Sequence, residues 1–187
     1  MQIKDELRKK SKLWREGLSE EEKSYLDEQI QKNCVDFILK NQFKTVLCYK
    51  SLKSEILTDK IIDCAFENSI ELFLPKCIND EEMIFYKVSD LSGLIKGKFS
   101  LEEPSEQSEA YSNGKGSVCV IPCLACDERG FRLGWGKGYY DRFLKDYSGT
   151  KAILCYSRQM EALLPKDEFD VCADYIITEK GVSESKK

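Results

Sequence analysis

Apolar and polar residues alternate along this chain with two different periods. Apolar residues three or four positions apart predict an amphipathic helix from Ser19 to about Leu39, and Glu22, three residues after Ser19, is a capping-box signal for its start. Its predicted inward side chains are Tyr25, Leu26, Ile30, Cys34, Phe37 and Ile38. Similar spacing predicts three further helices, over 2–14, after a cap at Thr58, and over 140–147.

Short, continuous apolar runs predict the strands of a sheet. The run at 117–121 is the strongest candidate for a central strand, and the run at 84–86 is expected at an edge. The remaining strands are predicted at 45–49, 71–75, 151–156 and 175–177, with Pro75 ending the second of them. Because strands alternate with helices, we expect a single compact α/β domain over 1–187 with a mainly parallel sheet.

Two segments depart from this alternation. Residues 89–115 contain many glycines, serines and a proline, and predict a long irregular loop, which in a compact domain usually has a functional role. Residues 182–187 predict a frayed tail. The sequence contains no run of 18 apolar residues, and its charged N-terminus lacks the apolar core of a signal peptide. We therefore expect a cytoplasmic protein with no membrane partner.

Composition excludes several kinds of chemistry. The 187 residues carry a net charge of −4, which gives no general attraction to nucleic acid, and they include no histidine. Catalysis by serine–histidine or cysteine–histidine pairs is therefore excluded. Among the nine cysteines, Cys123 and Cys126 have the spacing of a metal-ligand pair, but the sequence has no second such pair. We expect reduced, buried thiols and no metal or redox role for this pair.

The segment 132–141, which reads RLGWGKGYYD, is the most informative part of the sequence. Its three alternating glycines allow the backbone to approach a ligand closely and to adopt positive φ angles. Arg132 and Lys137 add positive charge, and the following helix begins with backbone N–H groups that attract an anion. Asp141, in the first helical turn, is placed to hold a metal ion beside a phosphate. The segment therefore predicts a phosphate site.

A purely structural interpretation of the same segment stays open at this point. Glycine-rich turns before helices are common, and Asp141 is also a favourable charge in a first helical turn. The sequence lacks the P-loop pattern Gly-x-x-x-x-Gly-Lys-Ser/Thr, and the glycine spacing of the segment differs from that of the dinucleotide-binding fingerprint.

Other motifs accompany this segment in a recognisable order. The sequence IPCLACDERG stands at 121–130, LPK at 74–76, GKFSLEEP at 97–104 and DYIIT at 174–178. Lys4 and Arg8 form a basic pair near the N-terminus, and Ser54 with Glu55 leads into a helix. Over about residues 1–180, the chain resembles the 5-formyltetrahydrofolate cyclo-ligases, also called methenyltetrahydrofolate synthetases.

The resemblance implies an ATP- and Mg²⁺-dependent enzyme with a sheet sandwiched by helices. It would convert 5-formyltetrahydrofolate to 5,10-methenyltetrahydrofolate, releasing ADP and phosphate. By position, the ATP-binding residues would be Lys4, Arg8, Arg132, Leu133, Gly134, Trp135, Gly136, Lys137, Gly138, Tyr139 and Tyr140. The folate would contact Lys50, Glu55, Trp135, Gly136, Lys137, Gly138 and Tyr139, and Mg²⁺ would be bound by Asp141 and Asp174. Catalysis would depend on Arg132, Lys137 and Asp141.

Each of these roles has an alternative in the residues themselves. Lys4 and Arg8 also suit a solvated helix face, and Trp135 with Tyr139 also suits a core. Glu55 suits a first helical turn, Asp174 a turn before a strand, and Lys50 a surface position at a strand end. Two positions depart from the family pattern. Lys137 stands where many members have glycine, and Phe169 stands where many have histidine.

The implied reaction does not require a histidine. The formyl oxygen of the substrate attacks the γ-phosphate of ATP, and the neighbouring folate amine then closes the ring as phosphate leaves. Because the substrate supplies both nucleophiles, the protein contributes positioning and charge neutralisation. Two other functions stay open: a non-catalytic reduced-folate-binding protein on the same scaffold, and a phosphosugar isomerase-like enzyme. We expect a monomer that acts on small molecules.

Overall fold

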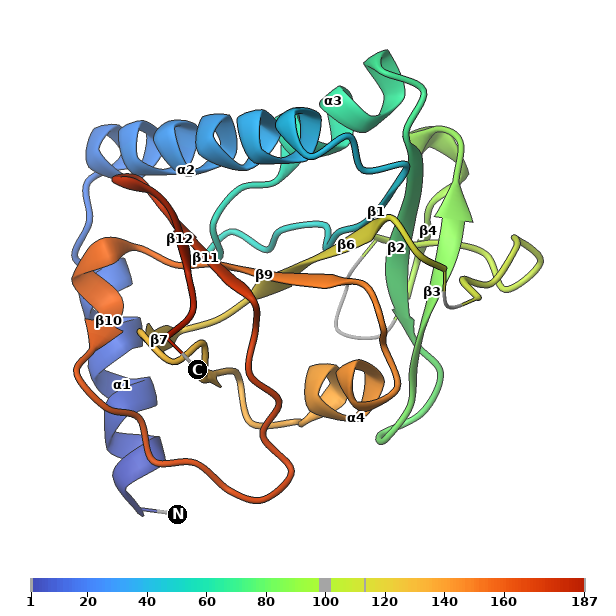
Figure 1. Cartoon of the computed structure of the whole chain (residues 1–187). Coiled ribbons are helices and arrows are strands. Elements are labelled where there is room, and N and C mark those ends of the chain that lie inside the picture. Colours follow the sequence, from blue (N-terminus) through green and yellow to red (C-terminus); the bar gives the residue numbers. More distant parts are fainter. Residues whose placement is uncertain (1, 98–101, 113, 187) are drawn as a thin grey trace.

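The computed structural model describes residues 2–97, 102–112 and 114–186, and its main feature is a seven-stranded sheet (Figure 1). The strands are β1 (Thr45–Leu47), β2 (Glu71–Cys77), β3 (Met83–Val88), β6 (Ser117–Pro122), β9 (Thr150–Leu154), β11 (Tyr175–Thr178) and β12 (Gly181–Glu184). Their order is β12-β11-β9-β6-β1-β2-β3. The pairs from β11 to β2 are parallel, whereas β3 and β12 pair antiparallel at the two edges.

Helices lie on both faces of this sheet, which confirms the predicted sandwich. They are α1 (Gln2–Glu16), α2 (Glu20–Lys40), α3 (Asp59–Glu67) and α4 (Tyr139–Lys145). In Figure 1, α2 and α3 cover one face, α4 lies on the other, and α1 stands at the side of the sheet. Within the part of the chain that the structure describes, none of the helices is both long and apolar enough to cross a membrane.

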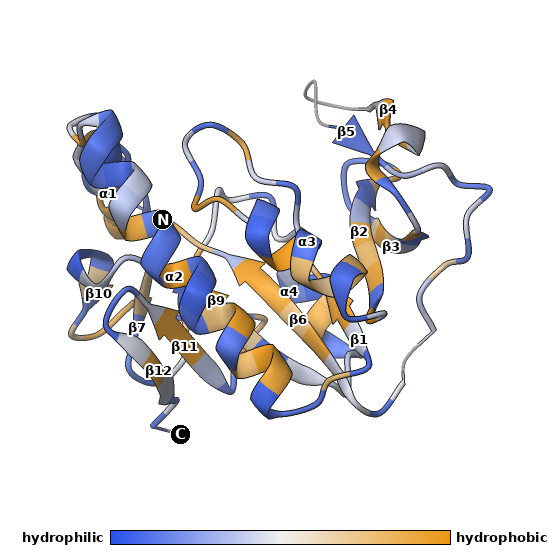
Figure 2. Cartoon of the chain, turned by 90° about the horizontal axis from the view of Figure 1, so that it is seen from above, coloured by the Kyte–Doolittle hydropathy of each residue, from blue (hydrophilic) through white to orange (hydrophobic). Residues whose placement is uncertain are grey.

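The central strand β6 is buried on both faces. Val118 and Val120 pack in the apolar cluster under α2 and α3, whereas Cys119 and Ile121 pack in the cluster under α4. Successive side chains of a strand point to opposite faces, so a strand covered on both sides consists of consecutive apolar residues. Figure 2 shows β6 as hydrophobic and α1 as largely hydrophilic. The prediction of a central strand at 117–121 is therefore confirmed.

A small three-stranded sheet extends from the carboxyl end of the main sheet. It consists of β7 (Ala125–Asp127), β8 (Arg132–Leu133) and β10 (Met160–Glu161), in the order β10-β7-β8. Asp127 and Gly130 form the turn between β7 and β8, where Gly130 has a positive φ of 83°. This small sheet brings the glycine segment back over the main sheet, next to α1.

The chain leaves β1 and β6, which are neighbours, in opposite directions. After β1 it passes through α3 to β2 on one side, and after β6 it passes through α4 to β9 on the other. In open α/β sheets, ligands bind outside the carboxyl ends of the strands at such a switch point. The loops at 48–58 and 123–138 leave the sheet here and frame the candidate site.

One predicted helix cap is present, whereas two other details of α2 and α3 differ from the sequence predictions. The capping box of α2 is present, with Ser19 Oγ accepting from the N–H of Glu22 and the Glu22 carboxylate accepting from the N–H of Ser19. However, Tyr25 is 63% exposed rather than inward, because Asp27 and Ile30 occupy the buried face. Thr58 precedes α3 without a side-chain cap, since its buried hydroxyl donates to the carbonyl of Tyr49 instead.

Three further segments differ from the sequence predictions. Strand β2 continues through Pro75 to Cys77, because beyond Phe73 it pairs with β3 alone and no ladder on the β1 side is interrupted. Residues 182–184 belong to β12 rather than to a frayed tail, since their backbone pairs with β11. The segment 89–115 contains a 3₁₀ turn and two short strands, β4 (Ile95–Lys96) and β5 (Glu102–Glu103), while 98–101 and 113 lie outside the described residues.

Candidate active site

The glycine segment forms a loop between β8 and α4. Gly136 and Gly138 have φ angles of 100° and 70°, a region that favours glycine. A β-carbon at Gly136 would also lie 3.4 Å from the guanidinium carbon of Arg8. Gly134 has no positive φ and open space around it, but its carbonyl accepts a hydrogen bond from Arg8 Nε at 3.0 Å. Two of the three glycines are therefore required by the backbone itself.

One face of α1 carries a row of cations beside this loop. Lys4, Arg8, Lys12 and Arg15 are spaced by four, four and three residues, which places them on the same side of a helix. Arg8 contacts the loop backbone, and Lys12 Nζ lies 4.7 Å from the centre of the Trp135 ring. Sequence reasoning selected Lys4 and Arg8 but missed Lys12 and Arg15, although the helical spacing was a usable signal.

Arg15 links α1 to both loops of the switch point. Its side chain is buried, with Nη2 donating to the Cys123 carbonyl at 2.6 Å and Nη1 to the Ser54 carbonyl at 3.2 Å. Its Nε donates to the side chain of Gln159. The loop after β1 and the loop after β6 are thus held by the same guanidinium group.

Lys4 contacts a different part of the chain. Its ammonium group lies 2.8 Å from Asp167 and 2.7 Å from Asp170. Partial burial disfavours the charge, but these two carboxylates outweigh it and raise the pKa of Lys4. The pair therefore anchors the start of α1 to the segment around Phe169, whose side chain is 72% exposed.

At the base of the glycine segment, Arg132 and Asp141 form an ion pair. The Arg132 side chain is only 4% exposed, and its Nη2 lies 2.9 Å from Asp141 Oδ1. Its Nη1 donates to the Val171 carbonyl at 2.9 Å, and the Val171 N–H donates back to Asp141 Oδ1 at 3.2 Å. Within the described residues, all contacts of the Asp141 carboxylate use Oδ1, so Oδ2 has no partner.

The tip of the segment, residues 135–137, is held much more loosely. Trp135 is 40% exposed, and its indole N–H donates to Glu55 Oε1 at 3.1 Å. Lys137 is exposed, and among the described residues its ammonium group has no hydrogen-bond or ion-pair partner. The tip therefore offers a flat aromatic surface and an uncompensated positive charge at the switch point.

Glu55 is the buried acid of the site. It is 8% exposed and accepts hydrogen bonds from Trp135 and from the backbone N–H of Leu52. Burial raises its pKa above the ordinary value despite these two donors. A buried carboxyl group with a raised pKa beside a cationic loop is a candidate functional residue.

Tyr140 carries a second unusual polar group. Its hydroxyl is buried and, among the described residues, has no hydrogen-bond partner. Burial raises its pKa well above the ordinary value, and the thiol of Cys119 and the carboxylate of Glu55 add to the effect. Buried polar atoms are normally satisfied, so an unsatisfied hydroxyl in the glycine segment is a candidate ligand contact.

The remaining predicted residues lie around this centre. Lys50 follows β1 and pairs with Asp59 at 2.8 Å. The Tyr139 hydroxyl donates to the Asn79 carbonyl at 2.8 Å, so the side chain is hydrogen-bonded rather than enclosed in the apolar core.

A cavity of about 340 Å³ lies next to Tyr139, and it is lined by Asn79, Glu81, Glu82, Met83, Tyr139, Arg142 and Phe143. Arg142, which sequence reasoning left out of the site, joins the 79–82 turn to the loop through the carbonyls of Glu81 and Lys137.

Asp174 lies at the other end of the parallel strands. It immediately precedes β11, and its carboxylate accepts from the backbone N–H of Lys151 at 2.9 Å and lies 3.8 Å from Lys151 Nζ. Asp141, by contrast, contacts Arg132 and Val171. The carboxylates of the two predicted metal ligands, Asp141 and Asp174, therefore contact different residues.

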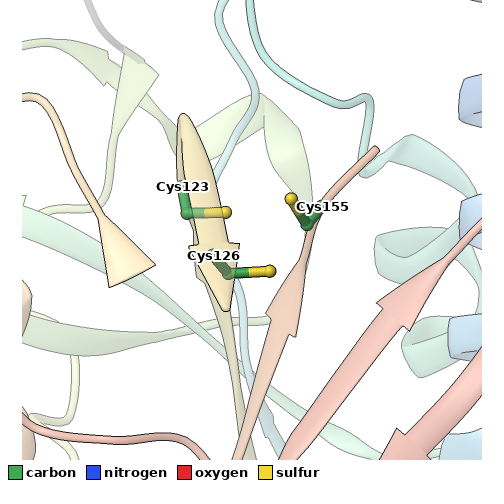
Figure 3. A group of neighbouring side chains, drawn as sticks. All are labelled: Cys123, Cys126 and Cys155. Atoms are coloured by element: carbon green, nitrogen blue, oxygen red, sulfur yellow. The ribbon is translucent and has the colours of Figure 1, made fainter. Parts of the chain in front are cut away.

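Three buried thiols meet below the crevice. The sulfur atoms of Cys123, Cys126 and Cys155 lie within 4.8 Å of one another, and Figure 3 shows them facing the space between their strands. Burial opposes ionisation of Cys123, but S–H donation from the other two thiols and the charges of Arg15 and Arg132 hold its pKa well below the usual range. Hydrogen bonding to Cys123 raises the pKa of Cys126 and Cys155.

The fold and the site together define a class: an α/β protein with a cationic glycine loop and a buried acid at the switch point of its sheet. Comparison with known proteins identifies the family. Residues 1–179 match the model of the 5-formyltetrahydrofolate cyclo-ligase family. The chain therefore belongs to this family, as the order of its motifs predicted.

Individual relatives agree with this assignment. A 5-formyltetrahydrofolate cyclo-ligase from Mycoplasma pneumoniae is 31% identical over 184 residues, which cover 95% of this chain and 99% of that protein. An NMR structure of 5,10-methenyltetrahydrofolate synthetase from Aquifex aeolicus matches with a TM-score of 0.84 and 34% identity, covering 99% of this chain and 94% of the other. The structure of the synthetase from Mycoplasma pneumoniae matches with a TM-score of 0.75 and 30% identity, covering 94% and 98%.

Proposed function

We propose that this protein catalyses the ATP- and Mg²⁺-dependent cyclisation of 5-formyltetrahydrofolate to 5,10-methenyltetrahydrofolate, with release of ADP and phosphate. Membership of the cyclo-ligase family supports the overall reaction. The observation that carries the proposal is the meeting of the glycine loop, the cationic face of α1 and Glu55 at one switch point. We further propose a cytoplasmic monomer that acts only on small molecules.

The phosphates of ATP are proposed to bind at the tip of the glycine loop. Lys137 supplies a charge that has no partner among the described residues, and Arg8 lies against Gly134 and Gly136 from the side of α1. Helix α4 has only seven residues, so its dipole contributes less than the sequence suggested, and the side-chain cations and loop amides are the main binding groups. Each charge-assisted contact to a phosphate contributes roughly 1.5–3 kcal/mol.

The folate is proposed to bind beside Trp135 and Glu55, with its donors replacing or sharing the indole hydrogen bond to Glu55. An exposed indole gives the pteridine ring a surface for stacking, and a carboxylate is the natural acceptor for the pteridine amino group. Glu55 is buried and has a raised pKa, so donors from a bound pteridine would stabilise its ionised form. The hydroxyl of Tyr140, which has no partner in the part of the chain that the structure describes, is proposed to donate to the same ligand. Lys50 and Tyr139 are proposed to line the outer part of this site.

The residues present fit a magnesium ion at Asp141. Mg²⁺ is usually held by one or two carboxylates together with substrate phosphates and waters, and Asp141 Oδ2 has no partner in the described structure. When bound, the ion would supply charge neutralisation at the phosphates. Arg132 fixes the position of the carboxylate. Asp174 is proposed as a second ligand, which requires it both to release Lys151 and to move from the start of β11 toward Asp141.

The reaction then needs only groups that the substrates bring. The formyl oxygen bonds to the γ-phosphorus as ADP leaves, and the folate amine then attacks the activated formyl carbon. Phosphate leaves as the ring closes, and the proton of the amine is released to solvent. Lys137 and Arg8 are proposed to neutralise the charge on the transferred phosphoryl group, and Trp135 with Glu55 to hold the folate in line. No histidine or protein nucleophile takes part.

An absorbance assay tests the proposal. The purified protein is incubated with 5-formyltetrahydrofolate and MgATP, with ATP and a chelator, or with a non-hydrolysable ATP analogue, and the conjugated methenyl product is followed. We expect product with MgATP alone. Folate binding without product under any condition would instead favour a reduced-folate-binding protein, and phosphosugar turnover without folate binding would favour an isomerase-like enzyme.

A further inference from the structure

The thiols of Cys123, Cys126 and Cys155 come together where two neighbouring strands of the main sheet meet the small sheet. Cys123 follows β6 and Cys126 lies in β7, while Cys155 directly follows β9. All three are at most 3% exposed, and their sulfur atoms lie within 4.8 Å of one another. Sequence spacing identified only the first two, and a pair without further ligands predicts no metal site.

We propose that Cys123, Cys126 and Cys155 form a binding site for one soft, thiophilic cation, with monovalent copper as the preferred ion. This site lies outside the proposed folate and nucleotide crevice, and its occupation does not depend on the folate reaction.

The spacing of the sulfur atoms suits direct ligation. A metal–sulfur bond of about 2.3 Å places the sulfurs of a three-coordinate ion roughly 4 Å apart. The observed upper limit of 4.8 Å therefore requires a contraction of at most about 1 Å. Rotation about side-chain bonds gives a movement of this size, so the backbone of β7 and β9 need not change.

The set of donors selects the kind of ion. Structural zinc sites have four protein ligands, but this cluster offers three, and the sequence contains no histidine to complete it. Magnesium and calcium require oxygen ligands, which the three thiols do not supply. Thiolate ligands favour soft ions such as Cu(I), which is stable with three sulfur ligands and needs no water in this buried place.

A positive charge next to the cluster offsets the charge of the thiolates. Arg15 is buried, and its guanidinium group binds the carbonyl of Cys123 at 2.6 Å. In the metal-free protein, the sulfur atoms of Cys123 and Cys155 each lie 3.4 Å from a backbone carbonyl oxygen, those of Leu154 and Tyr156. Binding of Cu(I) forms metal–sulfur bonds, releases thiol protons to solvent and changes no oxidation state.

Competition for Cu(I) tests the site directly. Fully reduced protein is titrated anaerobically with Cu(I) against a coloured Cu(I) chelator, until longer incubation no longer changes the reading, because the thiols are buried. We expect one equivalent to be bound and to be retained in excess Zn²⁺. Replacing a ligand should cost more than replacing a supporting residue, so Cys155→Ser and Cys126→Ser are expected to weaken binding by more than about 100-fold.

Two other cysteines provide matched controls. Cys34 is buried in the cluster under α2 and α3, and Cys172 is partly exposed. Cys34→Ser and Cys172→Ser are expected to leave Cu(I) affinity unchanged, and circular dichroism checks that all variants are folded. Uptake of no Cu(I), equal affinity in wild type and Cys155→Ser, or loss of affinity in Cys172→Ser would each overturn the proposal. X-ray absorption then identifies the ligands of the bound ion, and three sulfur neighbours are expected.

A second readout is independent of variants that unfold. Cu(I) is expected to raise the thermal midpoint of the wild-type protein, because it binds the folded cluster, and to leave that of a folded Cys126→Ser variant unchanged. Metal-free Cys123→Ser is expected to keep cyclo-ligase turnover. Failure of the metal site would therefore be distinguishable from failure of the proposed function.

Discussion

The base and the tip of the glycine segment lie only a few residues apart, yet the protein holds them in opposite ways. At the base, Arg132 is almost fully buried and is bound to Asp141 and Val171. At the tip, Lys137 is exposed and, within the described residues, unpaired, and Trp135 has a single hydrogen bond to Glu55. We therefore propose that the base sets the position of the loop, whereas the tip supplies the groups that contact the substrate.

This difference has an energetic basis. Removing one partner of a buried ion pair leaves an uncompensated buried charge, which strongly destabilises the fold. Substituting an exposed side chain without contacts usually changes stability by less than about 0.5 kcal/mol. Variants at the tip should therefore lose activity alone, and variants at the base should lose activity and stability together.

Lys137→Ala is the strongest test of the tip. Loss of a cation that acts on developing phosphate charge is expected to lower kcat by roughly 100–1,000-fold, while the free energy of unfolding stays within about 0.5 kcal/mol of wild type. Steady-state kinetics and urea unfolding measure the two quantities. Lys145→Ala, at the last turn of α4, is the matched control and should retain full activity. Full activity of Lys137→Ala would contradict the role of the tip.

Asp141→Asn separates metal binding from folate binding. The amide still accepts a hydrogen bond from the Val171 N–H but loses the negative charge, so turnover is expected to fall by roughly 100-fold at limiting Mg²⁺ while folate affinity is unchanged. The dependence of rate on Mg²⁺ concentration and a folate-binding titration measure this. An unaltered Mg²⁺ dependence would count against Asp141 as a ligand.

Arg132→Ala tests the base. The variant leaves Asp141 without its cation and the Val171 carbonyl without its donor, so we expect the free energy of unfolding to fall by about 2 kcal/mol, a reduced value because Asp141 is 27% exposed. The Michaelis constant for ATP should rise because the loop loses its fixed position. Urea unfolding and ATP kinetics check both effects. Wild-type stability with normal ATP kinetics would remove the distinction between base and tip.

Glu55→Gln tests the role of the carboxylate that Trp135 contacts at the tip. We expect the Michaelis constant for folate to rise by about tenfold, the effect of one lost charge-assisted hydrogen bond. As the pH is lowered, Glu55 becomes protonated and folate affinity of the wild type should fall. Because the pKa of Glu55 is raised, this fall should begin at a higher pH than an ordinary carboxyl group would give. The variant should lack this pH-dependent step. A pH series of folate titrations measures it, and identical profiles would exclude Glu55 from folate binding.

The raised pKa of Glu55 also predicts the direction of a stability change. The folded protein holds this proton more tightly than the unfolded chain, so the associated stability is present below the ordinary pKa and is lost as the pH rises through the raised value. Glu55→Gln should remove this decline. Urea unfolding of wild type and variant across the acidic range checks the sign.

Local patterns in the sequence predicted much of the fold and part of the site. The strand at 117–121, the capping box at Ser19 and the positive φ angles of Gly136 and Gly138 all depend on neighbouring residues and were predictable. The family resemblance predicted that Arg8 contacts the phosphates of ATP, which stays a prediction; the structure adds that Arg8 lies against the glycine loop. It also named Asp141 and Asp174 together, but their present contacts are separate, and the pairing stays a prediction.

Contacts between distant segments were not predictable in this way. Arg15 binds the carbonyl of Cys123, 108 residues away, and no local pattern indicates that contact. Cys155 joins Cys123 and Cys126 only because β9 lies next to β6 in the sheet. The tail looked frayed because its sequence is polar, but β12 lies at an edge, where backbone pairing with β11 is sufficient to order it.

The central claim is that nucleotide phosphates bind at the tip of the glycine loop. Titration of the isotope-labelled protein with MgATP, followed by the backbone amide resonances, tests this most directly. We expect the largest shifts at Gly134, Gly136, Lys137 and Gly138, with smaller shifts along the face of α1 that carries Arg8. Saturable binding of MgATP with these loop resonances unmoved would contradict the account.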